Sequence, residues 1–177
     1  MEKTARALSF AEQAHIGQKR KASGLPYIVH CFNVYSIVRE YKTSKNLDIV
    51  CAICILHDCL EDTDTTVSQL REMFGDIVAD TVMELTNDPE QIAKVGKEEY
   101  LNQKLLGLSN YALTIKLADM LANVTDKPTP EMIKRIENHI RFLRRNRTLT
   151  EPQINIAKHI DRIILGEHLY MALANRD

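Results

Sequence analysis

The sequence contains no long hydrophobic run and no excess of charge of either sign. No apolar stretch approaches the roughly 20 residues that cross a bilayer, which excludes a membrane-spanning protein. The first residues, MEKTARALSFAEQ, lack the apolar core of a secretion signal. The formal net charge is −1, so any anion binding must depend on a local cluster of basic residues. We therefore expect a cytoplasmic protein with no membrane partner.

The sequence also lacks the paired cysteine motifs of a zinc site or a disulfide framework. Of the four cysteines, only Cys51 and Cys54 form a C-x-x-C pair, and both lie in an apolar, helical run. No second pair accompanies them. We interpret all four, with Cys31 and Cys59, as small buried residues in a reducing compartment.

Strand-like alternation, internal repeats and low-complexity segments are absent as well. The chain shows instead a succession of amphipathic helical patterns with capping residues between them. The start signals are the capping-box spacings of Thr66 with Gln69 and Thr150 with Gln153, the cap Ser109, and Thr129-Pro130. The length of 177 residues suits one domain with a proper core. We predict an all-α, orthogonally packed helical bundle over residues 1–177.

The expected structure of three segments bears on function. The first helix is expected to run to about Arg20, which would place the basic cluster of residues 19–21 at its C-terminus. Another helix is expected over residues 33–41. Residues 90–108 are weakly patterned, and we interpret them as a solvated basic segment that could be mobile and close over an anionic substrate.

One segment carries an unusual density of ionisable groups. After the apolar residues 49–56 come His57-Asp58 and then Glu61-Asp62. If the segment is helical, His57 and Glu61 form one ladder pair, and Asp58 and Asp62 form another. Carboxylates buried near one another must be protonated, paired with cations or bound to a metal. An acidic helix end in solvent would explain one carboxylate but not this set, so we predict a metal site that also carries general acid/base groups.

Two further residues could belong to that site. Asp119 lies in a largely apolar helix and needs a partner, which a metal could supply. His30 follows an apolar stretch, although a lone histidine is more often a satisfied core residue.

The series His30, His57-Asp58 and Asp119 resembles the H…HD…D metal set of the HD-domain phosphohydrolases. Six motifs are similar to the hydrolase domain of RelA/SpoT homologs and occur in the same order over the first two-thirds of the chain. They are GQKRK (17–21), GLPYIVH (24–30), ILHDCLEDTDTT (55–66), FG (74–75), ELT (84–86) and IKLADMLANV (115–124). The closest shape is that of the single-domain small alarmone hydrolases, the group that includes the metazoan SpoT homolog. Because the chain ends at Asp177, we expect no synthetase domain.

The resemblance implies a fold of the HD-domain type and one divalent ion per chain, typically manganese, held by His30, His57, Asp58 and Asp119. Two imidazoles and two carboxylates without a thiolate suit a borderline-to-hard ion. The positions of Glu61 and Asp62 match the catalytic acids of the family. The residues implied in substrate binding are Arg20, Lys21, Tyr27, Lys94, Lys97 and Asn123.

The implied reaction removes the 3′-pyrophosphate of the guanosine alarmone (p)ppGpp, giving GDP or GTP. The chain departs from the family pattern at Cys31, Met120, Ala122 and Arg141-Phe142, which changes the pocket lining and no metal ligand. Three alternatives stay open: removal of the 2′-phosphate of NADPH, removal of pyrophosphate from tRNA ends by an antitoxin-type hydrolase, and a non-catalytic nucleotide-binding regulator. The intact ligand and acid set argues against the regulator. The arginines between residues 135 and 147 could contact tRNA, although a solvated helix face is the commoner interpretation. A homo-oligomer is left open.

Overall fold

The structure, a computed structural model, describes residues 2–41 and 44–174 and confirms the all-α prediction. The helices are α1 (Glu2–Ala14), α2 (Ile28–Tyr41), α3 (Leu47–Leu56), α4 (Cys59–Asp62), α5 (Val67–Phe74), α6 (Asp76–Leu85), α7 (Pro89–Val95), α8 (Lys97–Gly107), α9 (Asn110–Val124), α10 (Pro130–Asn146) and α11 (Glu151–Ala174). Within the described ranges there is no strand, and an isolated bridge joins Lys19 to Pro26. None of these helices is long and apolar enough to cross a membrane.

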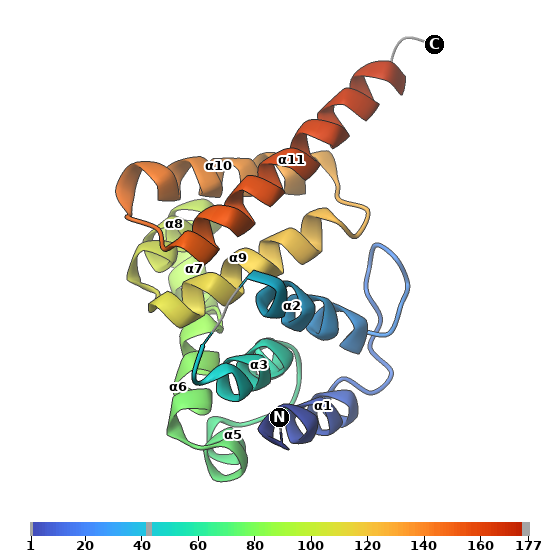
Figure 1. The fold of residues 1–177 in the computed structure, drawn as a ribbon. Helices are drawn as coiled ribbons and strands as arrows, with labels where there is room; N and C mark the ends of the chain where they lie inside the picture. Colours follow the sequence, from blue (N-terminus) through green and yellow to red (C-terminus); the bar gives the residue numbers. More distant parts are fainter. Residues whose placement is uncertain (1, 42–43, 175–177) are drawn as a thin grey trace.

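Helices α3 and α9 form the centre of the bundle (Figure 1). Helix α3 packs against α1, α2 and α6, and α9 packs against α2, α6 and α11. Residues 50–56 of α3 are all buried, and so are residues 112–124 of α9 except Lys116 and Asn123. Such continuous apolar burial is the main source of stability in the bundle. It also fixes the two helices that carry the ionisable residues.

Most helix starts follow the predicted capping signals. Thr66 and Gln69 form a complete capping box at α5, with the Gln69 amide donating to Thr66 Oγ1 and the Thr66 amide donating to Gln69 Oε1. Ser109 caps α9, and Thr129 caps α10 with Pro130 at its first position. These local hydrogen bonds satisfy the free amides of a helix start, which is why the sequence locates them well.

The predicted end of the first helix is wrong. Helix α1 stops at Ala14, and Gly17 then adopts a φ of 77°, a left-handed conformation that glycine tolerates. A short hairpin-like turn follows, in which the Arg20 amide donates to the Leu25 carbonyl (2.8 Å) and the Tyr27 amide donates to the Gln18 carbonyl (3.0 Å). Arg20 therefore lies on this turn and not at a helix C-terminus.

Two other segments are more helical than expected. Helix α2 begins at Ile28, ahead of the predicted residue 33, so His30 lies in its first turn. The stretch 90–108 forms α7 and α8, which corrects the prediction of a weakly structured segment. The Asp88 carboxylate accepts hydrogen bonds from the first amides of α7, and Gly96 (φ 85°) separates the two helices. Helix α8 was missed because its apolar face is weak and its boundaries depend on capping.

The N-terminus of α1 is held by a side chain from α3. The Asp48 carboxylate accepts hydrogen bonds from the amides of Lys3 (3.1 Å) and Thr4 (3.0 Å) and from Thr4 Oγ1 (2.5 Å). Slight burial opposes the charged form, but the hydrogen bonds from Thr4 and Lys3 outweigh it and lower the pKa of Asp48. The carboxylate therefore stabilises the fold above its unfolded pKa of about 3.9, and this stabilisation is lost as the pH falls toward the lower folded pKa.

We predict that Asp48→Asn lowers the free energy of unfolding at pH 7 by about 1 kcal/mol, because the Lys3 and Thr4 amides donate to different carboxylate oxygens and an amide nitrogen would replace one of them. Urea unfolding of the wild type and the variant at pH 7 and pH 3 provides the test. The difference should shrink at pH 3 because the wild-type carboxylate becomes protonated in the unfolded state. An equal difference at both pH values would contradict the charge assignment.

Candidate active site

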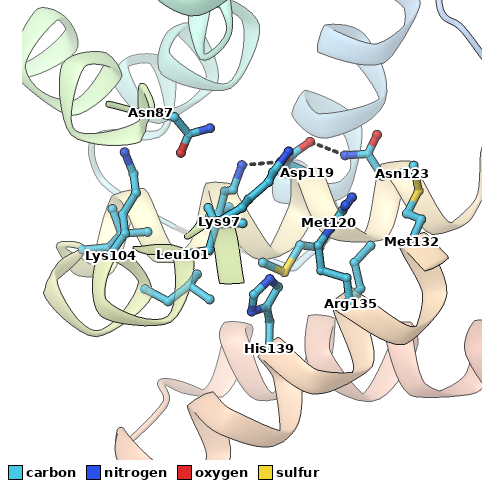
Figure 2. A pocket seen from close by; sticks show the side chains of 14 residues that line it. Asn87, Lys97, Leu101, Lys104, Asp119, Met120, Asn123, Met132, Arg135 and His139 are labelled. Carbon is cyan, nitrogen blue, oxygen red and sulfur yellow. Dashed lines mark hydrogen bonds and ion pairs between the residues drawn. The ribbon is translucent and has the colours of Figure 1, made fainter. Parts of the chain in front are cut away.

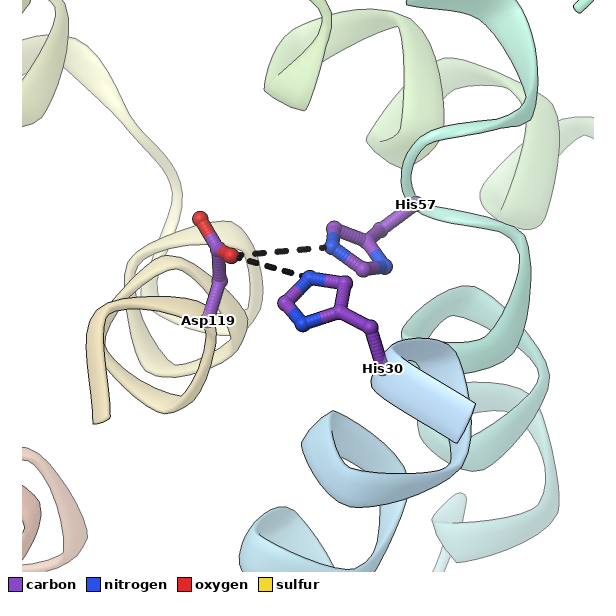
Figure 3. Close-up of side chains that lie close together, drawn as sticks. All are labelled: His30, His57 and Asp119. Atoms are coloured by element: carbon purple, nitrogen blue, oxygen red, sulfur yellow. Dashed lines mark ion pairs between the residues drawn. The ribbon is translucent and has the colours of Figure 1, made fainter. Parts of the chain in front are cut away.

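Three buried side chains from separate helices converge on one point in the bundle (Figure 3). His30 comes from α2, His57 follows the last residue of α3, and Asp119 lies in α9. One ligand atom from each lies within 4.8 Å of the ligand atoms of the other two. The fold thus brings together residues that are far apart in the sequence, as the metal-site prediction requires.

Asp58 lies against the same cluster. Its Oδ2 atom is 3.0 Å from His57 Nε2 and 3.5 Å from His30 Nε2. Asp119 Oδ1 is 3.2 Å from His30 Nε2 and 4.0 Å from His57 Nε2. Each of the two carboxylates, Asp58 and Asp119, therefore places an oxygen beside both imidazole nitrogens.

A break in the helix makes this arrangement possible. Helix α3 ends at Leu56 and α4 begins at Cys59, so His57 and Asp58 lie on a turn between them. In an ideal helix adjacent side chains diverge by about 100°, and here the backbone at Asp58 departs from ideal helical dihedrals (φ −102°, ψ −2°). Helix α3 does not continue through His57, but Asp58 and Asp62 still lie on one side, since the Asp62 amide donates to the Asp58 carbonyl (2.9 Å) and both carboxylates reach the Tyr27 hydroxyl. The Glu61 carboxylate lies against Asn87.

The residues present fit a divalent metal ion. His57 Nδ1 donates to the Cys54 carbonyl oxygen (2.8 Å), which leaves the lone pair of Nε2 directed at the cluster. That Nε2 atom is buried and, although Asp58 Oδ2 lies 3.0 Å away, no partner meets it in hydrogen-bond geometry. Two ligands that each lie about 2.1 Å from an ion are separated by roughly 3–4 Å, and the four carboxylate–imidazole distances of the cluster, 3.0 to 4.0 Å, match this spacing. Imidazole nitrogen and carboxylate oxygen also suit several divalent ions.

The charges of the cluster are compensated by a lysine that the sequence analysis did not assign. Lys116 Nζ lies 2.8 Å from Asp119 Oδ2, one helical turn away in α9. Burial disfavours the Asp119 carboxylate, but Lys116, His30 and His57 hold its pKa well below the usual range. Burial likewise opposes the Lys116 ammonium, and the Asp119 charge overcomes it and raises the pKa of Lys116. A lysine on an otherwise buried helix face, three residues before an aspartate, was the available signal.

The two predicted catalytic acids point in different directions. Glu61 accepts hydrogen bonds from the Asn87 backbone amide (3.1 Å) and from Asn87 Nδ2 (3.0 Å to each carboxylate oxygen). Asp62 Oδ2 lies 2.9 Å from the Tyr27 hydroxyl, next to the metal cluster. Partial burial and the charges of Asp58 and Glu61 raise the pKa of Asp62, although the hydrogen bond from Tyr27 opposes this. A carboxyl group with a raised pKa is suited to accepting and returning a proton.

Two neighbouring pockets open beside the cluster and share Asn123 and Met132. The first, here called the lysine pocket, has a volume of 220 Å³ and includes Asp119 (Figure 2). Its polar and charged lining residues are Asn87, Lys97, Lys104, Lys116, Asp119, Asn123, Arg135 and His139. The second, the arginine pocket, has a volume of 470 Å³ and includes Asp62. Its polar and charged lining residues are Gln18, Lys19, Arg20, Lys21, Tyr27, Asp62, Asn123 and Asp126.

The structure places most of the predicted substrate residues at these pockets. Arg20, Lys21 and Tyr27 line the arginine pocket, Lys97 lines the lysine pocket, and Asn123 lines both. Lys94 is exposed on α7 and lines neither. The predicted substrate-binding residues did not include Lys104, Lys116 or Arg135, and Arg135 was named only as a possible tRNA contact. Basic residues in amphipathic helices are usually solvated, which is why the sequence did not single them out.

Asn123 connects the cluster to the arginine pocket. Its Nδ2 atom donates to Asp119 Oδ1 (2.7 Å), and its Oδ1 atom accepts from Arg20 Nη2 (2.6 Å). Arg20 Nε in turn donates to Asp126 Oδ2 (3.0 Å). The guanidinium group is therefore oriented by two partners at the wall of the pocket.

Known proteins share the sequence features of this chain. The chain matches the HD domain family over residues 7–177 and belongs to that family. A zebrafish (Danio rerio) relative, guanosine-3′,5′-bis(diphosphate) 3′-pyrophosphohydrolase MESH1, is 35% identical over 127 residues, which cover 70% of this chain and 69% of that protein. A guanosine-3′,5′-bis(diphosphate) 3′-pyrophosphohydrolase from Aquifex aeolicus is 36% identical over 132 residues, which cover 70% of this chain and 17% of that protein.

A solved structure shows the same fold. It is that of a metazoan ortholog of SpoT that hydrolyses ppGpp, with a TM-score of 0.76 at 26% identity. The match covers 94% of this chain and 96% of that one. The orthogonal bundle predicted from the sequence is therefore the HD-domain fold.

We predict that Asp119→Asn loses most of its bound divalent metal, because one ligand oxygen of the cluster is replaced by an amide. Metal analysis of wild type purified without chelator should give about one divalent ion per chain. Asp64→Asn, an exposed change of the same chemistry near α4, is the matched control and should keep the ion. Full metal content in Asp119→Asn with unchanged circular dichroism would overturn the assignment.

Proposed function

We propose that this chain is a manganese-dependent hydrolase that removes the 3′-pyrophosphate of (p)ppGpp, giving GDP or GTP. The observation that carries this proposal is the position of the His/Asp cluster between two basic pockets that share Asn123. The names of the relatives, which describe this activity, support the same substrate. A nucleotide with phosphates at both the 3′ and 5′ positions suits a cleft that is basic on two sides.

The lysine pocket is cationic, because its only acid among the lining residues is Asp119. Against that one carboxylate stand Lys97, Lys104, Lys116 and Arg135. Burial, together with the nearby Lys116 charge, lowers the pKa of Lys104. Several ammonium and guanidinium groups around a small pocket favour a multiply charged anion such as a diphosphate.

A divalent ion held by His30, His57, Asp58 and Asp119 would neutralise phosphate charge and lower the pKa of a water molecule. We propose manganese because the donor atoms are imidazole nitrogens and carboxylate oxygens, with no thiolate, and such donors suit a borderline-to-hard divalent ion.

The side chains around the cluster then have distinct roles. Asp62 accepts the proton of the water that attacks the phosphorus atom attached to the 3′ oxygen. The bond from that phosphorus to the 3′ oxygen breaks, and the 3′ oxygen leaves as a hydroxyl by taking this proton back from Asp62. Glu61, oriented by Asn87, helps to place the water. Lys116 and Lys104 stabilise charge on the departing pyrophosphate.

We predict that Asp62→Asn reduces kcat for ppGpp by roughly 10²–10⁴-fold, the usual contribution of proton transfer by a positioned side chain. Glu61→Gln should reduce kcat by roughly tenfold, the effect of weakening one hydrogen bond to a charged group that places the water. Both changes preserve side-chain shape, so metal content and the unfolding midpoint should stay at wild-type values. Pyrophosphate release measured by a coupled assay gives kcat. Near-normal turnover in both variants would move the acid/base role to another group.

We predict that Arg135→Met raises KM for ppGpp roughly tenfold with a smaller effect on kcat, because a charged contact to a substrate phosphate is lost. Arg145→Met, on the exposed face of the same helix, is the matched control and should keep the wild-type KM. The assay is pyrophosphate release from ppGpp in the presence of manganese.

Two experimental outcomes would change the proposed substrate without affecting the assignment of the fold. Release of inorganic phosphate from NADPH, with ppGpp untouched, would favour the 2′-phosphatase alternative. A steep fall in activity on tRNA ends with added salt, and a loss in Arg145→Met, would favour a tRNA substrate. The cytoplasmic location and the single-domain organisation stay predictions, and the oligomeric state stays open.

A further inference from the structure

The ring of Tyr27 is held on several sides in the arginine pocket. His15 stacks on it with ring centroids 4.7 Å apart and an interplanar angle of 22°. The His30 ring contacts it in an edge arrangement at 5.7 Å, and Arg20 Cζ lies 5.7 Å from its centroid. Its backbone amide donates to the Gln18 carbonyl in the hairpin-like turn. These contacts fix the direction of the phenol group.

That phenol group reaches two carboxylates at once. The hydroxyl oxygen lies 2.7 Å from Asp58 Oδ2 and 2.9 Å from Asp62 Oδ2. The Asp58 oxygen is the same atom that faces the His57 and His30 nitrogens. The hydroxyl therefore connects a candidate metal ligand to a candidate proton acceptor.

Asp62 needs such a connection. It is the last residue of the short helix α4, and its side chain is exposed. A carboxylate at a helix end keeps considerable rotational freedom, which a hydrogen bond to a rigid aromatic residue removes. The backbone is fixed separately, since Gln18 Nε2 donates to the Asp62 carbonyl at 2.6 Å. Gln18 itself lies 2.7 Å from His15 Nδ1.

We propose that Tyr27 is a positioning residue, whose hydroxyl holds the Asp62 carboxylate beside Asp58 and the metal-ligand cluster. This inference rests on the proposed function, in which Asp62 accepts the proton of the attacking water. It differs from the sequence-based expectation that Tyr27 binds substrate. A binding residue acts mainly on KM, whereas a residue that places the proton acceptor acts on kcat.

The test is Tyr27→Phe, which removes the hydroxyl and keeps the ring that stacks on His15. We expect kcat for ppGpp to fall roughly tenfold, the effect of losing one hydrogen bond to a charged group, with KM within about twofold of wild type. Tyr35→Phe, a phenol on α2 whose ring contacts Phe32, is the matched control and should be unaffected. The effect of Tyr27→Phe should vanish in an Asp62→Asn background, because the hydroxyl acts through that carboxylate.

A crystal structure of each metal-loaded protein gives a second measurement. Asp62 should lie within hydrogen-bonding distance of the hydroxyl in the wild type and should rotate away in Tyr27→Phe. An increase in KM at constant kcat, additive effects with Asp62→Asn, or an unmoved Asp62 in Tyr27→Phe would each overturn the proposal. If the wild type leaves ppGpp uncleaved, the proposed function fails, and the crystal structures still decide whether Tyr27 positions Asp62.

Discussion

Keeping like charges together inside an apolar bundle is the constraint on which this site depends. The Asp58 and Asp119 carboxylates lie within a few ångströms of the same two imidazoles, in a region enclosed by α2, α3 and α9. Anions in such a setting are costly unless cations or a metal compensate them. Lys116 supplies one such cation from within α9. The buried and mostly apolar faces of α3 and α9 supply the rigidity that keeps these groups from separating.

From that centre, hydrogen bonds extend outward to the pockets. Asn123 connects Asp119 to Arg20, and Arg20 is anchored by Asp126. On another side, Tyr27 connects Asp58 to Asp62. The residues that would meet substrate are thus oriented by the residues that would hold the metal. Such supporting contacts determine how accurately a reactive group is placed.

Sequence reasoning worked best where the signal was local. Thr66, Ser109 and Thr129 cap helices as predicted, since each bonds to amides two or three residues away. It failed for residues 90–108, whose helices have weak apolar faces. It also failed at Arg20, because a glycine at positive φ ends the preceding helix region and a hairpin-like turn follows. The motifs nevertheless pointed to His30, His57 and Asp119, which the structure brings together from separate helices.

The sequence by itself determined the all-α class, most helix starts and the chemical nature of the donor set. Only the tertiary structure decided that His57 and Asp58 could face one point, because a break between α3 and α4 redirects adjacent side chains. The tertiary structure also decided that Lys97 lines the lysine pocket whereas Lys94 lines neither pocket. It placed Lys104 and Arg135 in the lysine pocket as well. The physical reason is the distance along the chain over which each interaction acts. Capping and periodicity act within a few residues along the chain, whereas the direction of a side chain depends on how distant helices pack.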